Sequence, residues 1–104
     1  KGMINLRWEI SEHCYLYKNN FGFILNNSQN TKVSQFPKGV KKDDEYFGEV
    51  EVFYSFVETY LKINSKEKNE IRVTYQGCNE KGFCYPPIKK VLSILPDSQK
   101  IVIN

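Results

Sequence analysis

Two of the three cysteines lie in one stretch of the chain, Val73-Thr74-Tyr75-Gln76-Gly77-Cys78-Asn79-Glu80-Lys81-Gly82-Phe83-Cys84-Tyr85-Pro86-Pro87. Apolar and polar residues alternate from Ile71 to Gln76, which predicts a strand with one buried and one solvent-exposed face. Asn79 and Gly82 both tolerate a positive φ, so the residues between the cysteines predict a tight turn. The stretch is therefore expected to form a hairpin of strand, turn and strand.

Cys78 and Cys84 would face each other across this hairpin. Directly opposed Cα atoms in an antiparallel pair lie about 4.5–5.5 Å apart, within the about 4.4–6.8 Å that a disulfide needs. A bridge that closes about seven residues stabilises a fold by only about 2.4 kcal/mol on the loop-entropy model. A strained or exposed bridge is also easier to reduce than a buried structural one, which favours a reactive pair. A bridge that only rigidifies the hairpin stays open as the alternative.

The composition indicates one β-rich domain over residues 1–104. A chain of this length buries roughly two-thirds of its unfolded surface in one core, and its content of 7 Tyr, 7 Phe and 1 Trp favours strands. The net charge of +3 is spread over 15 basic and 12 acidic residues without a basic stripe, which argues against nucleic-acid binding. No apolar run approaches the length of a membrane span and no signal peptide is present, so the domain itself is expected to be soluble.

Three segments in the first quarter of the chain show the alternation of a half-buried strand. In the first segment, Trp8 shares its face with aliphatic residues and is expected in the core. In the second, Tyr15 and Tyr17 share one face, either as core residues or as the wall of a site, and Cys14 lies on the other face. The segments are Ile4–Ile10, Cys14–Tyr17 and Phe21–Leu25.

A polar and charged region follows these strands. Residues 26–35 predict a loop because they are rich in Asn, Ser, Gln and Thr. Residues 41–48 then change abruptly from charged side chains to two aromatic rings and a glycine. They form either a solvated loop with an aromatic anchor or a cap, in which Tyr46 or Phe47 covers a reactive group and Gly48 permits the chain to turn.

The second half of the chain adds further short strands. The apolar residues change parity at Phe56-Val57, which predicts a bulge or a change of sheet there. Residues 64–70 predict a charged hairpin turn that leads into the cysteine strand. Seven or so strands separated by turns predict an all-β fold, best described as a β-sandwich. The last two strands are expected at Val91–Leu95 and Lys100–Ile103, joined by Pro96-Asp97-Ser98.

Metal binding and nucleophilic hydrolysis both fit the cysteine pair poorly. Structural zinc sites favour cysteines roughly two to four residues apart with further ligands elsewhere, whereas Cys78 and Cys84 have five residues between them. A cysteine nucleophile needs a base and an orienting partner, and His13, the one histidine, is far from the pair in sequence. We therefore expect no metal and no cofactor.

The cysteine motif and four other segments resemble the N-terminal periplasmic domain of DsbD, the thiol:disulfide interchange protein of Gram-negative bacteria. The motif comprises Tyr75-Gln76-Gly77-Cys78 and Gly82-Phe83-Cys84-Tyr85-Pro86-Pro87. The other segments occur in the family's order, so the resemblance covers most of the chain. They are Trp8-Glu9-Ile10, Tyr15-Leu16-Tyr17-Lys18, Phe36-Pro37-Lys38-Gly39-Val40 and Asp44-Glu45-Tyr46-Phe47-Gly48.

The resemblance implies an all-β, immunoglobulin-like β-sandwich that carries a redox hairpin subdomain. It implies a thiol:disulfide oxidoreductase that accepts electrons from the thioredoxin-like C-terminal domain of the same protein. The electrons would pass to periplasmic thioredoxin-fold proteins, namely disulfide isomerases and a cytochrome c maturation thioredoxin. The domain would be a monomer on the periplasmic side of the bacterial inner membrane, attached only through the rest of the chain. Residues 1–104 would then be an excised or N-terminally trimmed part of a longer membrane protein.

By motif position, the resemblance implies different roles for the two cysteines of the hairpin. Cys84 would form the mixed disulfide with a partner, and Cys78 would resolve it. Nothing in the pattern gives Cys14 a redox role, so we expect a buried free thiol there. The alternative function is that of an immunoglobulin-like binding module, whose disulfide only shapes a recognition loop.

The other site residues are expected around that pair. The family's cap usually has Phe before Tyr, whereas this chain has the reverse order, so either ring is a candidate cover. Carboxylates near the thiols would raise the thiol pKa and slow stray reactions. The resemblance implies a cap loop of Asp44, Glu45, Tyr46 and Phe47, and a site lined by Tyr15 and Tyr17.

Overall fold

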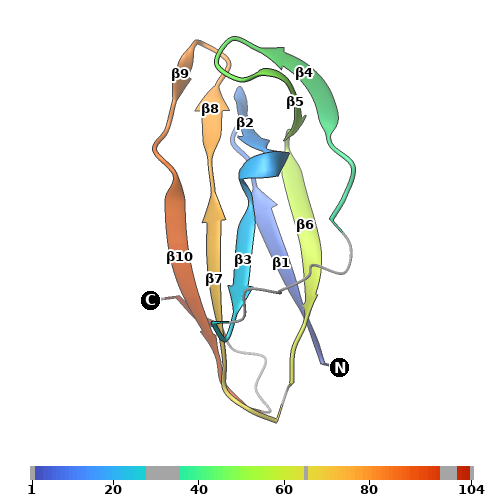
Figure 1. The fold of residues 1–104 in the computed structure, drawn as a ribbon, viewed down its shortest axis with the longest axis vertical. Helices are drawn as coiled ribbons and strands as arrows, with labels where there is room; N and C mark the ends of the chain where they lie inside the picture. The colour runs from blue at the N-terminus through green and yellow to red at the C-terminus, as the bar shows by residue number, and fades with distance from the viewer. Residues whose placement is uncertain (1, 28–35, 65, 97–100, 104) are drawn as a thin grey trace.

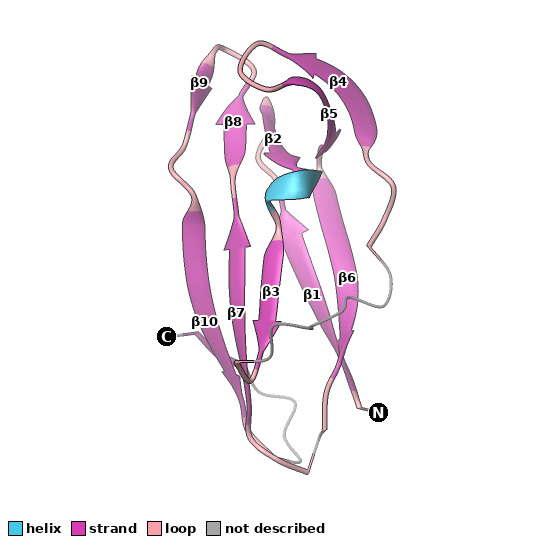
Figure 2. Ribbon diagram, in the orientation of Figure 1, coloured by secondary structure: helices cyan, strands magenta, loops and turns pink. Residues whose placement is uncertain are grey.

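The computed structural model is an elongated molecule of about 45 × 23 × 22 Å that is built almost entirely of strands (Figures 1 and 2). It describes residues 2–27, 36–64, 66–96 and 101–103, the last three for the backbone only. Most of the loop expected at residues 26–35 and most of the joint expected at Pro96-Asp97-Ser98 lie outside the described residues.

Eleven strands and one short 3₁₀ helix occur within the described residues. The helix, η1, spans Lys18–Asn20. None of the described helical residues forms a segment long and apolar enough to cross a membrane. The strands are β1 (Met3–Glu9), β2 (Cys14–Tyr17), β3 (Gly22–Leu25), β4 (Val40–Asp44), β5 (Gly48–Phe53), β6 (Phe56–Lys62), β7 (Asn69–Tyr75), β8 (Gly77–Asn79), β9 (Phe83–Cys84), β10 (Ile88–Ile94) and β11 (Ile101–Ile103).

The body of the molecule is a sandwich of two antiparallel sheets. One sheet pairs β1 with β6, and the other has the order β11-β10-β7-β3. Alternate residues of these strands face inward, as the period of two in the sequence predicts, and Trp8 packs against the core through ring contacts with Phe21, Phe23 and Tyr75. The predicted β-sandwich is therefore confirmed. Its buried core consists of Ile4, Leu6, Leu61, Ile71, Val73, Leu92 and Ile94.

A third antiparallel sheet, of order β4-β5-β2-β8-β9, forms one end of the molecule. The turns between β4 and β5 and between β8 and β9 meet at the top of Figure 1, away from the N-terminus. This sheet has a small core of its own, made of Tyr15, Tyr17, Val52 and Cys78. The sandwich therefore carries a separate subdomain that contains both cysteines of the motif.

The chain passes from the body to the end sheet and back at short irregular points. Between β5 and β6, Ser55 has a φ of 68° and the backbone N–H of Phe56 donates to the Tyr54 carbonyl at 2.7 Å. The change of sheet expected at Phe56-Val57 is confirmed, although it falls slightly earlier in the chain. Between β7 and β8 only Gln76 lies outside the strands, so the expected cysteine strand is divided between two sheets.

Three local predictions were wrong. Residues 41–48 are not a continuous loop, because β4 runs to Asp44; this strand lies at a sheet edge and carries charge on both faces, so no alternation marks it. Residues 64–70 are not a hairpin turn, because β6 and β7 belong to different sheets. The buried Asn69 amide donates to the carbonyls of Asn64 and Glu67 and holds that crossing. The strand expected from Val91 begins earlier, at Ile88, directly after the two prolines.

We predict that Ile71→Ala lowers the free energy of unfolding by about 2–5 kcal/mol, because Ile71 is 0% exposed between the two sheets and the truncation leaves a cavity. Urea denaturation followed by circular dichroism measures the change. Ile24→Ala is the matched control, since Ile24 is 40% exposed and should cost less than about 1 kcal/mol. Equal losses in the two variants would contradict this placement of the core.

Candidate functional site

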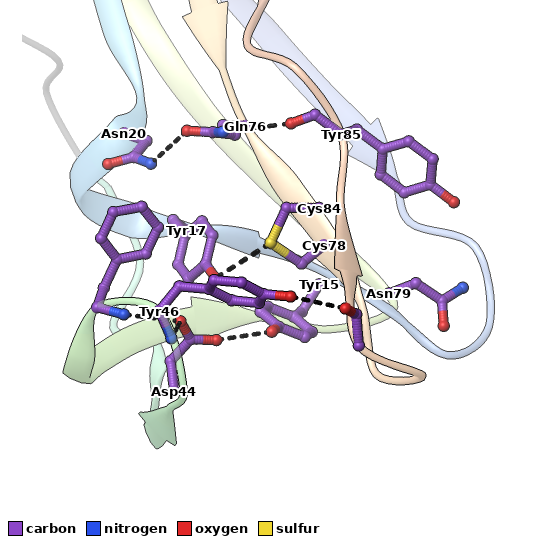
Figure 3. Close-up of a disulfide and its surroundings, with 12 residues drawn as sticks. Tyr15, Tyr17, Asn20, Asp44, Tyr46, Gln76, Cys78, Asn79, Cys84 and Tyr85 are labelled. Carbon is purple, nitrogen blue, oxygen red and sulfur yellow. Dashed lines mark hydrogen bonds between the residues drawn. A yellow bond between two sulfur atoms is a disulfide. The ribbon is translucent and has the colours of Figure 1, made fainter.

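A disulfide joins Cys78 of β8 to Cys84 of β9 (Figure 3). The two residues are directly paired across the hairpin, with Cα atoms 3.9 Å apart, which is closer than the sequence-based expectation. Cys78 is 1% exposed, because β8 lies between β2 and β9. Cys84 is only half-buried, because β9 is the edge strand of its sheet. One sulfur-bearing residue is therefore enclosed and the other borders the solvent.

The hairpin that carries the disulfide has the expected tight turn. The N–H of Gly82, at a φ of 105°, donates to the Asn79 carbonyl at 3.0 Å, and the Asn79 side chain accepts from the N–H of Lys81. At the base of the hairpin, a Cβ on Gly77 would lie 2.5 Å from the Tyr15 carbonyl oxygen. Only glycine therefore permits β8 to approach β2 beside Cys78.

The Tyr17 hydroxyl lies directly against the disulfide. Its oxygen is 3.1 Å from Sγ of Cys78 and 3.9 Å from Sγ of Cys84. Sulfur atoms in a disulfide carry no hydrogen, so the hydroxyl is the donor in this state. Burial raises the pKa of Tyr17 to about 12, with a further contribution from Asp44. Tyr17 therefore keeps its proton at neutral pH and presents it to the enclosed sulfur.

Asp44 is 4% exposed, and both of its carboxylate oxygens accept hydrogen bonds. The Tyr15 hydroxyl donates to Oδ1 at 2.8 Å, and the backbone N–H groups of Tyr46 and Phe47 donate to Oδ2 at 2.9 and 3.0 Å. Burial raises the pKa of Asp44, but the hydrogen bonds from Tyr15 and from the two backbone groups outweigh it, so the pKa lies below its ordinary value. The buried side chain is thus held as a carboxylate.

The β4–β5 turn extends from Asp44 over the cysteine hairpin. Gly48 permits the turn through a φ of 75°. The Tyr46 hydroxyl donates to the Gly82 carbonyl at 2.6 Å, and the Phe47 ring meets the Tyr17 ring edge-on at 5.0 Å between centroids. Both aromatic residues of the turn are therefore engaged, one with the hairpin tip and one with the tyrosine that touches the sulfurs.

A polar cavity of about 290 Å³ lies between the two turns. Carboxylates of both turns line it, and Lys42 is the cation in its wall, with Nζ 4.9 Å from the centre of the Tyr15 ring. Among the described residues, no three His, Cys, Asp or Glu side chains are grouped closely enough to hold a metal ion. The lining residues are Tyr15, Lys42, Asp43, Asp44, Glu45, Tyr46, Asn79, Glu80 and Gly82.

The structure brings all eight residues named from the sequence to this end of the molecule. Glu45 is the least engaged of them, because it is exposed and approaches the hairpin only near Gly82. Sequence reasoning missed Lys42, whose spacing of two from Asp44 would have placed both on one face of a strand. It also missed the pairing of Asn20 with Gln76, which in turn donates to the Tyr85 carbonyl beside Cys84 (Figure 3). No local pattern marks that contact.

Cys14 is the free cysteine among the described residues, as expected, but it is half-buried rather than buried. It is paired with Asn79 across β2 and β8, and the Asn79 amide lies 3.7 Å from its sulfur. Cys78 is paired with Tyr15, the next residue of β2. Neighbouring residues of a strand point to opposite faces, so Cys14 faces away from the disulfide.

The family model described as "Thiol:disulfide interchange protein DsbD, N-terminal" matches residues 1–96. The chain belongs to this family. DsbD from Haemophilus ducreyi is 36% identical over 99 residues, which cover 94% of this chain and 17% of that protein. DsbD 1 from Pseudomonas aeruginosa is 40% identical over 85 residues, which cover 79% of this chain and 14% of that protein. The chain therefore spans less than a fifth of the length of these DsbD proteins.

Solved structures of DsbD N-terminal domains have the same fold. The reduced domain from Neisseria meningitidis matches with a TM-score of 0.79 and 26% identity, over 95% of this chain and 79% of that one. The complex of the DsbD and PilB N-terminal domains from Neisseria meningitidis contains a chain that matches with a TM-score of 0.71 and 26% identity, over 93% of this chain and 82% of that one. The expected immunoglobulin-like sandwich is confirmed.

We predict that Asp44→Asn lowers the free energy of unfolding by about 1–3 kcal/mol at pH 7. The carboxylate accepts from three donors, whereas the amide offers them only one, uncharged acceptor oxygen. The folded pKa of Asp44 lies below its ordinary value, so its stabilisation is present above about pH 4, the ordinary pKa of Asp, and is lost as the pH falls through the folded pKa. Urea denaturation between about pH 7 and 2 should therefore give a shallower acid loss in Asp44→Asn than in the unmodified domain.

The control for this prediction is Asp43→Asn, which removes an exposed carboxylate from the same strand. It should change the free energy of unfolding by no more than about 0.5 kcal/mol. A wild-type acid profile in Asp44→Asn would show that the Asp44 carboxylate does not stabilise the folded domain.

Proposed function

We propose that this domain is a thiol–disulfide relay that cycles the Cys78–Cys84 pair between disulfide and dithiol. It accepts two electrons from a thioredoxin-like domain of the same full-length protein and passes them to thioredoxin-fold proteins. The observation that carries the proposal is the inequality of the two cysteines, since Cys84 borders the solvent on an edge strand and Cys78 is enclosed. Membership of a thiol:disulfide interchange family supports the same chemistry.

The relay is loaded when an incoming thiolate attacks Sγ of Cys84. The attacking sulfur forms an intermolecular disulfide, the Cys78–Cys84 bond breaks, and Cys78 leaves as a thiolate that takes up a proton. The donor's second thiol then attacks the intermolecular bond and releases Cys84. The donor becomes a disulfide, and the domain holds two electrons and two protons as a dithiol.

The relay is discharged by the reverse order of events on a new partner. The Cys84 thiolate attacks the partner's disulfide and forms a mixed disulfide, while one partner sulfur leaves as a thiolate. Cys78 then attacks Cys84, restores the internal bond and releases the partner's second thiol. The partner is reduced by two electrons, and the domain returns to the state of the present structure.

Tyr17 and Asp44 support these steps from behind the pair. A donor 3.1 Å from Sγ of Cys78 stabilises the charge that develops there when Cys84 is attacked. The carboxylate of Asp44 opposes thiolate formation nearby, which limits stray reactions of the reduced pair. Tyr15 positions Asp44, and the β4–β5 turn of Glu45, Tyr46 and Phe47 acts as the cap.

The partners follow from this chemistry and from the family. We propose that the electron acceptors are periplasmic disulfide isomerases and a cytochrome c maturation thioredoxin, and that the domain acts as a monomeric protein-disulfide reductase. A solved structure contains a related domain from Neisseria meningitidis in complex with the PilB N-terminal domain, which supports docking of partner domains on this fold. We further propose that the chain is one periplasmic domain of a longer membrane protein, since its curated relatives are far longer.

We predict that Cys78→Ser traps a stable mixed disulfide with an oxidised periplasmic disulfide isomerase, whereas Cys84→Ser does not. The reason is that Cys84 borders the solvent and that, without Cys78, no sulfur of the domain can attack the mixed disulfide and release the partner in reduced form. Non-reducing electrophoresis and intact mass measure the adduct. Both variants carry Cys14→Ser, so that the free thiol contributes no adduct of its own. The reverse pattern would assign the attacking sulfur to Cys78.

We also predict that millimolar reduced glutathione opens the Cys78–Cys84 bond and that a reduced thioredoxin-fold protein does so faster. The count of free thiols should rise from one, that of Cys14, to three. Quenching with an alkylating reagent and mass spectrometry measures it. An immunoglobulin-like binding module with a purely structural bridge predicts the opposite, a pair that stays oxidised in both reagents.

A further inference from the structure

We propose that the Tyr46 hydroxyl is a latch that fastens the cap turn to the redox hairpin and slows the attack of small thiols on Cys84. This inference rests on the proposed function, because it describes how access to the same disulfide is regulated. The contact that carries it is the hydrogen bond of 2.6 Å from the Tyr46 hydroxyl to the Gly82 carbonyl.

The latch joins two turns that have no other hydrogen bond between them among the contacts of the described residues. Tyr46 belongs to the β4–β5 turn, and Gly82 belongs to the turn between the two cysteine strands. They are 36 residues apart in sequence. The base of the cap is fixed separately, because the N–H of Tyr46 donates to the buried Asp44 carboxylate. The backbone of the cap is thus anchored, and the Tyr46 side chain reaches across to the hairpin (Figure 3).

The latch lies close to the reacting atoms. Gly82 is two residues before Cys84, and the Tyr46 side chain points toward Tyr17 and the cysteine hairpin (Figure 3). The Tyr17 hydroxyl is in turn 3.1 Å from Sγ of Cys78. A Tyr46 side chain held against Gly82 therefore occupies space beside the disulfide, through which an attacking thiol would approach.

The contact is also suited to opening. Tyr46 is 52% exposed, so water replaces the lost partner on either side when the hydrogen bond breaks. Such a bond shifts an equilibrium between closed and open states by about fivefold, equal to about 1 kcal/mol at 1.4 kcal/mol per tenfold. The latch therefore lowers the open population without preventing opening. A docking partner that covers the cap can supply that energy from its own contacts.

The proposal assigns the effect to one oxygen atom rather than to the ring. Phenylalanine at position 46 would keep the ring and the backbone hydrogen bond to Asp44 but would have no donor for the Gly82 carbonyl. The Phe47 ring, which packs against Tyr17, is unaffected by that change. Tyr46→Phe thus separates the latch from mere coverage of the site.

The test measures the second-order rate at which dithiothreitol reduces the Cys78–Cys84 disulfide. One dithiothreitol thiolate attacks Cys84 and displaces Cys78, and its second thiol displaces Cys84 and closes to cyclic disulfide, so two electrons enter the domain. We expect Tyr46→Phe to react about fivefold faster than the unmodified domain. Tyr60→Phe is the matched control, since it removes a hydroxyl from an exposed tyrosine of β6, in the body of the sandwich. The rate of this variant should not change.

Two further measurements make the result decisive. The Tm of Tyr46→Phe should fall by no more than about 8 °C, which is what the loss of about 1 kcal/mol produces in a domain of about 100 residues; a fast rate combined with a larger fall in Tm would overturn the latch in favour of general loosening. Tyr46→Ala removes the ring as well. An unchanged rate in Tyr46→Phe, whether or not Tyr46→Ala is faster, would overturn the role of the hydroxyl. Trapping by Cys78→Ser is independent of these rates, so failure of the latch and failure of the relay are distinguishable.

Discussion

The buried carboxylate of Asp44 joins β2 to the turn that directly follows Asp44 in the chain. It accepts from the Tyr15 hydroxyl in β2 and from the backbone N–H groups of Tyr46 and Phe47 in the cap turn. An unpaired charge in this position would cost several kcal/mol, so the turn and the tyrosine keep their places while Asp44 stays ionised. The positions of the Phe47 ring on Tyr17, and of the Tyr46 hydroxyl on the hairpin, follow from that one side chain.

The body of the fold was predictable because burial leaves a period of two in the sequence. The strands around Leu6 and Val73 each have one face in the core, and their alternation marks them clearly. The change of parity near Phe56 likewise marks the point where the chain leaves the end sheet for the body. The hairpin was predictable from turn chemistry and from its cysteines, and the family motif identified the residues around it.

The rest could not be predicted, because it depends on contacts between distant residues. β4 carries charge on both faces, so nothing local separates the buried Asp44 from the exposed Asp43. The order of Tyr46 and Phe47 does not show that one ring would reach Gly82 and the other Tyr17. The division of the cysteine strand at Gln76 has only a weak local signal, since a single buried residue, Cys78, follows it with the parity of the polar Thr74 and Gln76. These features are fixed only when β2, β5 and β8 pair.

The pairing of β2 with β8 has a consequence for the fidelity of the redox pair. Cys14 and Cys78 lie on adjacent strands one register step apart, yet on opposite faces of the sheet. The sheet is therefore a partition between the spare thiol and the disulfide. Shuffling of the bond from Cys84 to Cys14 would require β2 and β8 to separate and so break the small core around Tyr17. The register therefore protects the Cys78–Cys84 bond against exchange with Cys14.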